Sequence, residues 1–208
     1  MSSHDAASES LGAGAEPDLD SIQRLDRNFF GVAVFITSEG IFFLTLIITY
    51  IAYRGESTSG PSPQQVLNVP VASFFTVFLL ASSITMAKVT SRLNAGDAPG
   101  VRRWLLATIS LGTIFVLGQG YEYVRFITDG ITISRNLWSS TFFTLTGFHG
   151  LHVLVGLIAM AVLVKVVDQT PEKLRGRSGV EAISIYWHFV DAVWVVIFPV
   201  VYLWTLFS

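Results

Sequence analysis

Cysteine is absent from the 208 residues, and charged residues supply only 13% of them. The lack of cysteine excludes disulfide bonds, iron–sulfur clusters and thiolate-bound copper or zinc. Soluble domains carry about 25% charged residues, so this chain has about half the usual number for a surface that faces water. A formal net charge of −2 at pH 7 offers no basic surface for nucleic acid. These shortages exclude an ordinary soluble enzyme and favour an integral membrane protein.

Hydrophobic residues make up 51% of the chain and gather in five long runs. Each run is near the roughly 20 residues that a helix needs to cross the hydrocarbon core of a bilayer. Each run must be helical, because lipid offers the backbone no hydrogen-bond partners. We therefore expect an all-α, polytopic membrane protein with one five-helix transmembrane domain at residues 29–208. The expected spans are residues 29–53, 69–88, 104–127, 138–166 and 182–207.

Residues 1–28 are rich in Ser, Ala, Gly and acidic residues and contain no apolar run. This composition indicates a flexible cytoplasmic tail rather than a signal peptide. Ten of the 13 Lys and Arg residues lie in the tail and at the second and fourth connections between spans, which share one side of the membrane. Because cytoplasmic segments carry an excess of positive charge, we expect the N-terminus inside and the C-terminus outside.

Ionisable side chains within membrane spans are costly, at about 2.5–3.5 kcal/mol near the centre of a helix, and are therefore functional candidates. Glu39 is expected roughly 15 Å from the inner end of the first span. One interpretation is a carboxyl group that is hydrogen-bonded to a neighbouring helix. The other is a group that takes part in proton movement or lies beside it.

Two further pairs of ionisable residues have helical spacing. His149 and His152 are three residues apart on the fourth span, and His188 and Asp191 are three apart on the fifth. With Glu39 at a depth similar to that of Asp191, the pattern predicts an intramembrane polar cluster between these spans and the first. Metal ligation by the two histidines of the fourth span would need further ligands, so hydrogen bonding between helices is favoured and no metal site is expected. A haem held between His149 and His188 is disfavoured, because their expected depths differ by about 16 Å.

Glu122 and Arg125 are also three residues apart, near the outer end of the third span. They share a helix face, which predicts a structural ion pair or a contact with a lipid headgroup. No residue of the chain is expected to be catalytic. Small residues on the third and fourth spans would allow close helix packing in lipid. They are Gly112, Gly118, Gly120, Gly147, Gly150 and Gly156.

Four stretches resemble subunit III of the haem-copper terminal oxidases. They are Ser38–Phe43, Gln119–Tyr123, Phe148–Val153 and Tyr186–Trp194. They occur in the same order as in that family, and the resemblance extends from Phe29 to the C-terminus. Five spans instead of seven resemble the short bacterial form, which lacks the first two helices of the long form.

The resemblance implies a subunit without haem or copper, which packs against the catalytic subunit I of a respiratory oxidase in the bacterial plasma membrane. Haem and copper would belong to that partner. The family holds phospholipids and supports proton uptake and turnover stability, and the carboxyl group at the position of Glu39 reacts with carbodiimides. A cytochrome c oxidase is the favoured assignment, and a quinol oxidase is also compatible with the sequence.

Three other functions fit parts of the pattern. One is an accessory subunit of a nitric oxide reductase, which would co-purify with haem and non-haem iron. Another is an autonomous small transporter or proton channel, which would give carbodiimide-sensitive flux in liposomes. The last is a b-type haem anchor, which a visible spectrum of the pure chain would reveal.

Overall fold

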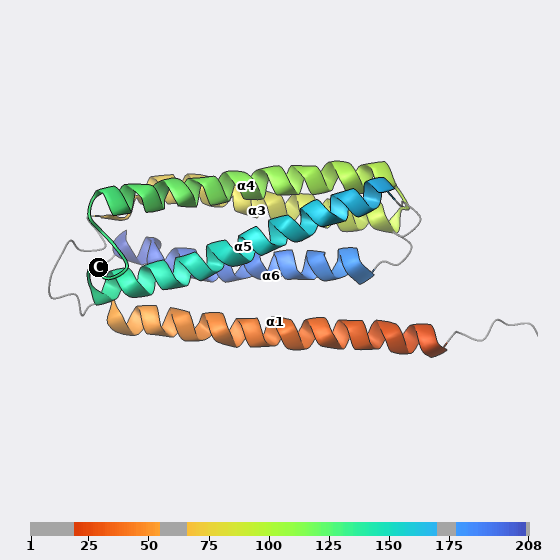
Figure 1. The fold of residues 1–208 in the computed structure, drawn as a ribbon, viewed down its shortest axis with the longest axis horizontal. Coiled ribbons are helices and arrows are strands. Elements are labelled where there is room, and N and C mark those ends of the chain that lie inside the picture. The colour runs from red at the N-terminus through yellow and green to blue at the C-terminus, as the bar shows by residue number, and fades with distance from the viewer. Residues whose placement is uncertain (1–18, 55–65, 170–177, 207–208) are drawn as a thin grey trace, which may run out of the picture.

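The computed structural model describes residues 19–54, 66–169 and 178–206, which form helices and no β-strand (Figure 1). Five of these helices are long and apolar enough to cross a membrane, which confirms the expected all-α, five-span organisation. The helices are α1 (Leu19–Tyr53), α3 (Val69–Asn94), α4 (Ala98–Thr128), α5 (Leu137–Gln169) and α6 (Ser178–Val201). A short 3₁₀ helix, η2 (Leu203–Leu206), follows α6.

Several helices extend beyond the apolar runs from which they were predicted. α1 begins at Leu19, so residues 19–28, expected in the flexible tail, belong to the helix, whereas residues 1–18 lie outside the described residues. α4 begins at Ala98 instead of residue 104, because the Asp97 side chain accepts a hydrogen bond from the backbone N–H of Gly100 at 2.9 Å. Such a cap satisfies a backbone donor that the helix itself leaves without a partner. Hydropathy locates the membrane-crossing part of a helix, and the caps decide where the helix begins.

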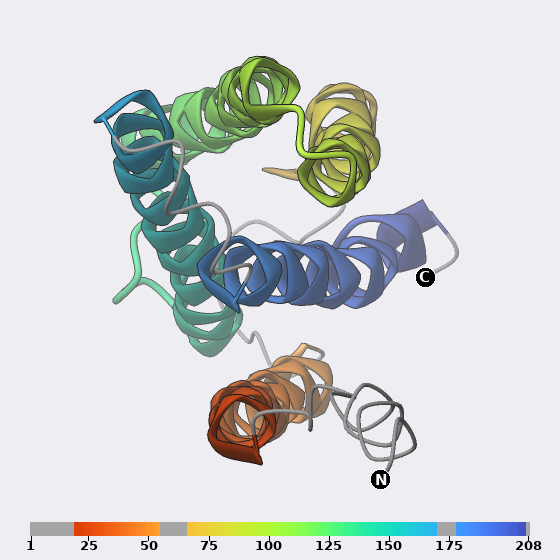
Figure 2. The ribbon, with the colours of Figure 1, turned by 90° about the vertical axis from the view of Figure 1, so that its right-hand side faces the viewer.

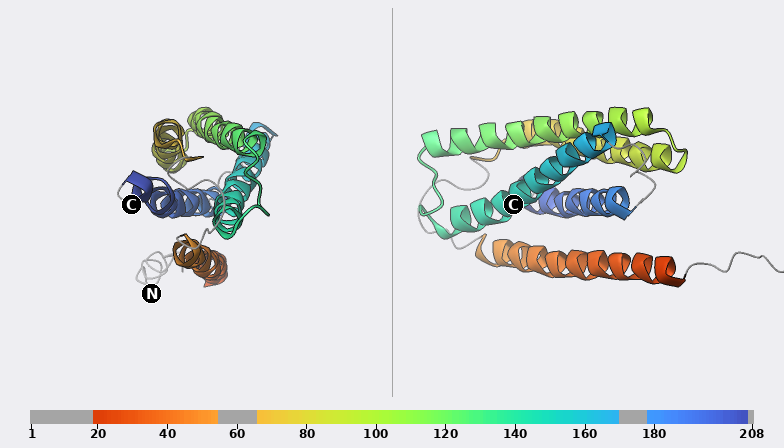
Figure 3. Two further views of the ribbon diagram at one scale, coloured as in Figure 1. Left: turned by 90° about the vertical axis from the view of Figure 1, so that its left-hand side faces the viewer. Right: turned by 45° about the vertical axis from the view of Figure 1, so that its right-hand side comes forward.

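Helices α3, α4, α5 and α6 form a ring in which each packs against the next, and α6 closes the ring against α3. Seen end-on, these four helices surround a common centre and α1 lies outside them (Figure 2). α5 crosses the bundle diagonally, from the side of α1 at its start to the side of α4 at its end (Figures 1 and 3). α1 packs on the outer side of α5 and α6. The fold is therefore a four-helix ring with one helix added to its surface.

Contacts at one end of the bundle attach the last turns of α1 to the ring. The Trp138 Nε1–H group of α5 donates a hydrogen bond to the fully buried hydroxyl group of Tyr50 at 3.3 Å. The Arg54 guanidinium lies over the ring of Trp204, 4.7 Å from its centroid. Along the rest of α1, large apolar side chains such as Phe30 and Ile41 are more than half exposed. This outer face of α1 is suited to lipid or to another membrane protein.

Trp187 of α6 lies where α3, α4 and α5 meet. A Cβ atom at Gly112 of α4 or at Gly156 of α5 would lie less than 3.0 Å from its indole ring. Its Nε1–H group donates a hydrogen bond to Ser82 Oγ of α3 at 3.0 Å. Small residues thus let the helices approach closely around one large ring, as expected for association within lipid.

The first residues of α1 and the last residues of α6 lie at opposite ends of the bundle (Figure 1). An odd number of membrane crossings requires this separation. Which end faces the cytoplasm depends on the charge pattern of the connections, and the inside location of the N-terminus stays a prediction.

Candidate functional site

The structure joins α1 to α5 through a carboxyl–imidazole pair. Glu39 Oε2 lies 3.0 Å from His152 Nε2. The two side chains are 22% and 15% exposed, so they are partly accessible from the surface of the bundle. The other ring nitrogen, His152 Nδ1, lies 2.7 Å from the backbone carbonyl oxygen of Phe148. Both nitrogens of this imidazole therefore have a partner.

The carbonyl partner determines which nitrogen of His152 carries a proton. A carbonyl oxygen can only accept a hydrogen bond, so Nδ1 donates to Phe148. A bond between Nε2 and Glu39 then needs one more proton, held either by the carboxyl oxygen or by Nε2. Both arrangements have the same total charge of zero. The pair can thus hold one transferable proton without adding net charge to the membrane interior, where an isolated charge is costly.

Neighbouring side chains fix the position of this pair. The Tyr186 hydroxyl group of α6 donates a hydrogen bond to the backbone carbonyl of His152 at 3.0 Å. The Phe43 ring meets the imidazole of His152 edge-on, with 4.9 Å between the ring centroids. Phe43 is itself buried and belongs to the same helix as Glu39. The pair is therefore held between three helices by aromatic side chains.

His149 lies one turn from His152 but faces the interior of the ring. Its side chain is fully buried, and its imidazole stacks on the indole of Trp194 with 4.7 Å between centroids. The edge of Phe115 contacts it from α4, at 6.0 Å between centroids. Among the described residues, none forms a hydrogen bond with either ring nitrogen. The structure therefore separates His149 from the pair that His152 forms.

His188 and Asp191 face α3 instead of α1. His188 Nδ1 lies 2.7 Å from Ser83 Oγ. Asp191 is buried close to the same hydroxyl group, but within the described residues neither of its oxygens has a partner at hydrogen-bond geometry. The residues predicted as one polar cluster thus occupy three places: the α1–α5 contact, the ring interior and the α3–α6 contact.

Glu122 and Arg125 also have separate partners. Glu122 is buried, and its Oε2 accepts a hydrogen bond from the Tyr202 hydroxyl group of α6 at 2.6 Å. Arg125 lies 3.9 Å from Asp129 of its own helix, where both side chains are exposed. Residues three apart on a helix differ by about 60° in direction, so they can face different neighbours.

Sequence reasoning missed the polar contacts that cross between helices. Gln119 Nε2 donates to the carbonyl oxygen of Thr146 at 3.0 Å, and the hydroxyl groups of Tyr123 and Thr146 lie 2.6 Å apart. Gln119 and Tyr123 are four residues apart, which places them on one face of α4 and was the only signal available. The partner residue on α5 could not be recognised from spacing.

Within the three described ranges, no group of three or more His, Asp or Glu side chains could hold a metal ion. The geometry that stands out is instead the Glu39–His152 pair, a carboxyl–imidazole contact of 3.0 Å between α1 and α5.

Comparison with known proteins gives a consistent result. A family model described as cytochrome c oxidase subunit III matches residues 23–206. The probable cytochrome c oxidase subunit 3 of Mycobacterium leprae is 38% identical over 192 residues, which cover 92% of this chain and 95% of that protein. The cytochrome c oxidase subunit 3 of Synechocystis sp. is 38% identical over 182 residues, covering 86% and 76% of the two chains. The cytochrome bo(3) ubiquinol oxidase subunit 3 of Pseudomonas putida is 34% identical over 173 residues, covering 83% and 84%.

Proposed function

Because the chain belongs to the cytochrome c oxidase subunit III family, we propose that it is the subunit III of a cytochrome c oxidase in a bacterial plasma membrane. In this role it carries no haem or copper and catalyses no reaction itself. It packs against the catalytic subunit, holds phospholipid on its lipid-facing surface, and supports proton uptake and turnover stability in its partner.

Two features support the proposal that the chain is a subunit of a membrane-bound cytochrome c oxidase. The relatives from Mycobacterium leprae and Synechocystis sp. are named as subunits of cytochrome c oxidases. The outer face of α1 exposes large apolar side chains, including Phe30, Ile41 and Ile48, along a helix that packs mainly against α5 and α6. A face of this kind suits burial against another membrane protein or against lipid.

The single observation that carries the proton-related role is the 3.0 Å contact between Glu39 Oε2 and His152 Nε2. The pair holds one transferable proton and remains neutral overall, so it can lie within the membrane without a counter-ion. Its partial exposure makes it reachable by a neighbouring subunit. We assign it the role of maintaining a hydrogen-bonded, proton-exchanging environment beside the proton-uptake route of the catalytic subunit.

This role is tested in the intact oxidase by Glu39→Ala, His152→Leu and the double variant. We expect each single variant to inactivate faster during turnover and to take up protons more slowly. We expect the double variant to be no worse than the singles, because residues that act as one unit are not additive. Ser38→Ala is the matched control, since among the described residues the Ser38 hydroxyl group donates only to the Phe35 carbonyl of its own helix, at 2.7 Å. Inactivation at the wild-type rate in both single variants, or strictly additive effects, would contradict the role.

A quinol oxidase is the second candidate, because the relative from Pseudomonas putida is named as a subunit of a ubiquinol oxidase. The electron donor is a property of the whole complex. Purification of the complex in mild detergent, followed by oxygen consumption with reduced cytochrome c and with a quinol, separates the two. Activity with cytochrome c alone supports the first assignment, and activity with quinol alone replaces it.

A further inference from the structure

A small cavity lies inside the ring between α3, α4 and α6. Its volume is about 10 Å³, and its lining includes Ala72, Phe75, Glu122, Trp194 and Tyr202. All but two of its lining residues are apolar or aromatic. The exceptions are Glu122 and Gln119 of α4. Tyr202 and Trp194, which also line the cavity, carry a hydroxyl group and an N–H group.

Glu122 presents one oxygen that the protein does not satisfy. The residue is only 5% exposed, and its Oε2 accepts the hydrogen bond from Tyr202 at 2.6 Å. Its Oε1 is buried and has no hydrogen-bond partner among the described residues. Trp194 cannot supply one, because its Nε1–H group donates to Thr76 Oγ1 at 3.0 Å. Buried polar atoms in folded proteins are nearly always hydrogen-bonded, to protein or to ordered water.

We propose that this cavity binds one water molecule, which donates a hydrogen bond to Glu122 Oε1. The cavity has about the volume that a single water requires, and a water needs two to four polar partners. Glu122 Oε1 provides one acceptor, and Tyr202 and Gln119, which carry a hydroxyl oxygen and an amide oxygen, also line the cavity. The bound water completes the hydrogen bonding of Glu122 and links α4 to α6 alongside the direct contact with Tyr202.

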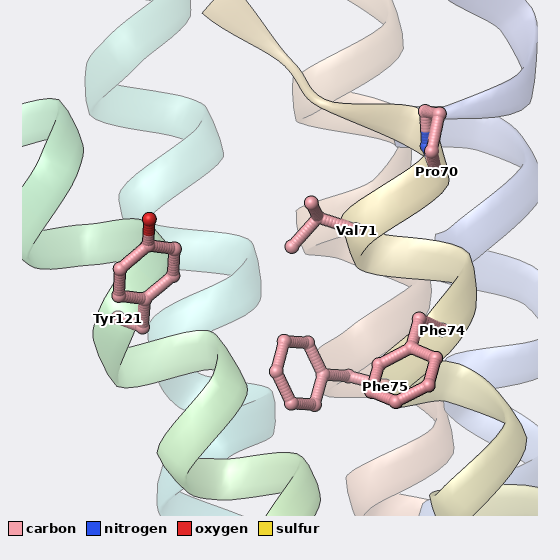
Figure 4. A pocket seen from close by; sticks show the side chains of 5 residues that line it. All are labelled: Pro70, Val71, Phe74, Phe75 and Tyr121. Atoms are coloured by element: carbon pink, nitrogen blue, oxygen red, sulfur yellow. The ribbon is translucent and has the colours of Figure 1, made fainter.

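The cavity adjoins a groove on the lipid-facing surface, which gives the water a route of exchange. This groove has a volume of about 500 Å³ and is lined by Pro70, Val71, Phe74, Phe75 and Tyr121 (Figure 4). Val71 and Phe75 line both the groove and the cavity. The Phe75 ring rests on Gly118, where a Cβ atom would overlap the ring. Phe75 thus separates Glu122 from the groove, and rotation of its ring opens the passage.

The bound water does not depend on the proposed function. It concerns a second intramembrane carboxyl group, which is buried within the ring, whereas Glu39 belongs to α1 outside it. Glu122 Oε1 accepts a hydrogen bond from this water molecule, which exchanges through the seam between α3 and α4. This arrangement holds whether or not the Glu39–His152 pair supports proton uptake.

The water is tested by electron cryo-microscopy of the intact oxidase at a resolution that shows ordered water in other buried sites. We expect one compact density within hydrogen-bond distance of Glu122 Oε1. Ala72→Val adds two methyl groups to the lining and should remove this density. Ala87→Val is the matched control, because it makes the same change on an exposed position of the same helix. Absence of the density in the wild-type protein, or an elongated density of an acyl chain in its place, overturns the proposal.

Infrared spectroscopy of the same complex supplies a second measurement, which stands if Ala72→Val fails to assemble. We expect the carboxyl bands assigned to Glu122, by their loss in Glu122→Gln, to shift within minutes of transfer from H₂O to D₂O. Phe75→Ala joins the cavity to the groove and should make this shift faster. A Glu122 band that stays unshifted for hours in the wild type, or an exchange rate that Phe75→Ala leaves unchanged, counts against the water and its route.

Discussion

The contact between Gly118 and Phe75 allows a quantitative test of the packing between α3 and α4. Gly118→Ala places a Cβ atom inside the volume of the Phe75 ring, so either the ring or the helix must move. Gly120→Ala on the same helix adds the same atom where no other heavy atom lies within 4 Å. The two variants therefore differ in steric surroundings and share the chemistry of the substitution.

The expected magnitudes follow from two opposing effects. Replacing Gly by Ala within a helix stabilises it by up to about 1 kcal/mol, and this gain applies to both variants. Overpacking a close contact costs about 1–3 kcal/mol, and this cost applies only at Gly118. We expect Gly120→Ala to be neutral or stabilising, and Gly118→Ala to be less stable than Gly120→Ala by about 1–3 kcal/mol.

The assay is the free energy of unfolding of the purified chain in mixed detergent micelles, followed by the loss of helical circular dichroism. Only the difference between the two variants is needed, so the shared effect of helix propensity cancels. Equal unfolding free energies, within about 0.5 kcal/mol, would show that Phe75 does not rest on Gly118 and would refute the packing described for this seam.

The two histidines of α5 should respond oppositely to the same change. His149→Leu replaces a buried imidazole whose nitrogens lack protein partners, so the unfolding free energy should stay equal or rise by up to about 1–3 kcal/mol. His152→Leu leaves Glu39 without its partner and should lower the free energy of unfolding by about 1–3 kcal/mol. Equal changes in the two variants would contradict the surroundings described for the two histidines. Asp168→Asn breaks the 2.7 Å ion pair with Arg102, but the unfolding free energy should change by less than about 1 kcal/mol, because both side chains are about half exposed. A larger loss in low salt would show that this pair holds α4 to α5.

The family and the number of spans could be recognised from the sequence because both depend on local features. Each apolar run forms a helix without help from its neighbours, since in hydrocarbon the backbone has no alternative to hydrogen bonds within the segment. The short stretches around Glu39, His149 and His188 resembled subunit III of the haem-copper oxidases, and the comparisons confirmed that family.

The ends of the helices were harder to predict from hydropathy. The polar residues 19–28 continue α1 although they contain no apolar run. A helix that the membrane has already nucleated extends at little cost into sequence of reasonable helix propensity. The start of α4 at Ala98 depends on the cap Asp97, a residue that an analysis of hydropathy alone does not identify as a helix start. The start of α3 at Val69, capped by Asn68, agrees with the expected span.

By itself, the sequence determined that the chain has five segments long and apolar enough to cross a membrane, that ionisable groups lie within them, and which family the chain resembles. Only the tertiary structure decided that Glu39 pairs with His152, that His149 stacks on Trp194, and that Glu122 bonds to Tyr202. The physical reason is that helix formation depends on hydrogen bonds between residues four apart, whereas the partner of a side chain depends on how each helix is rotated and crossed against its neighbours. A difference of about 60° between residues three apart is enough to send two histidines of one helix to different helices.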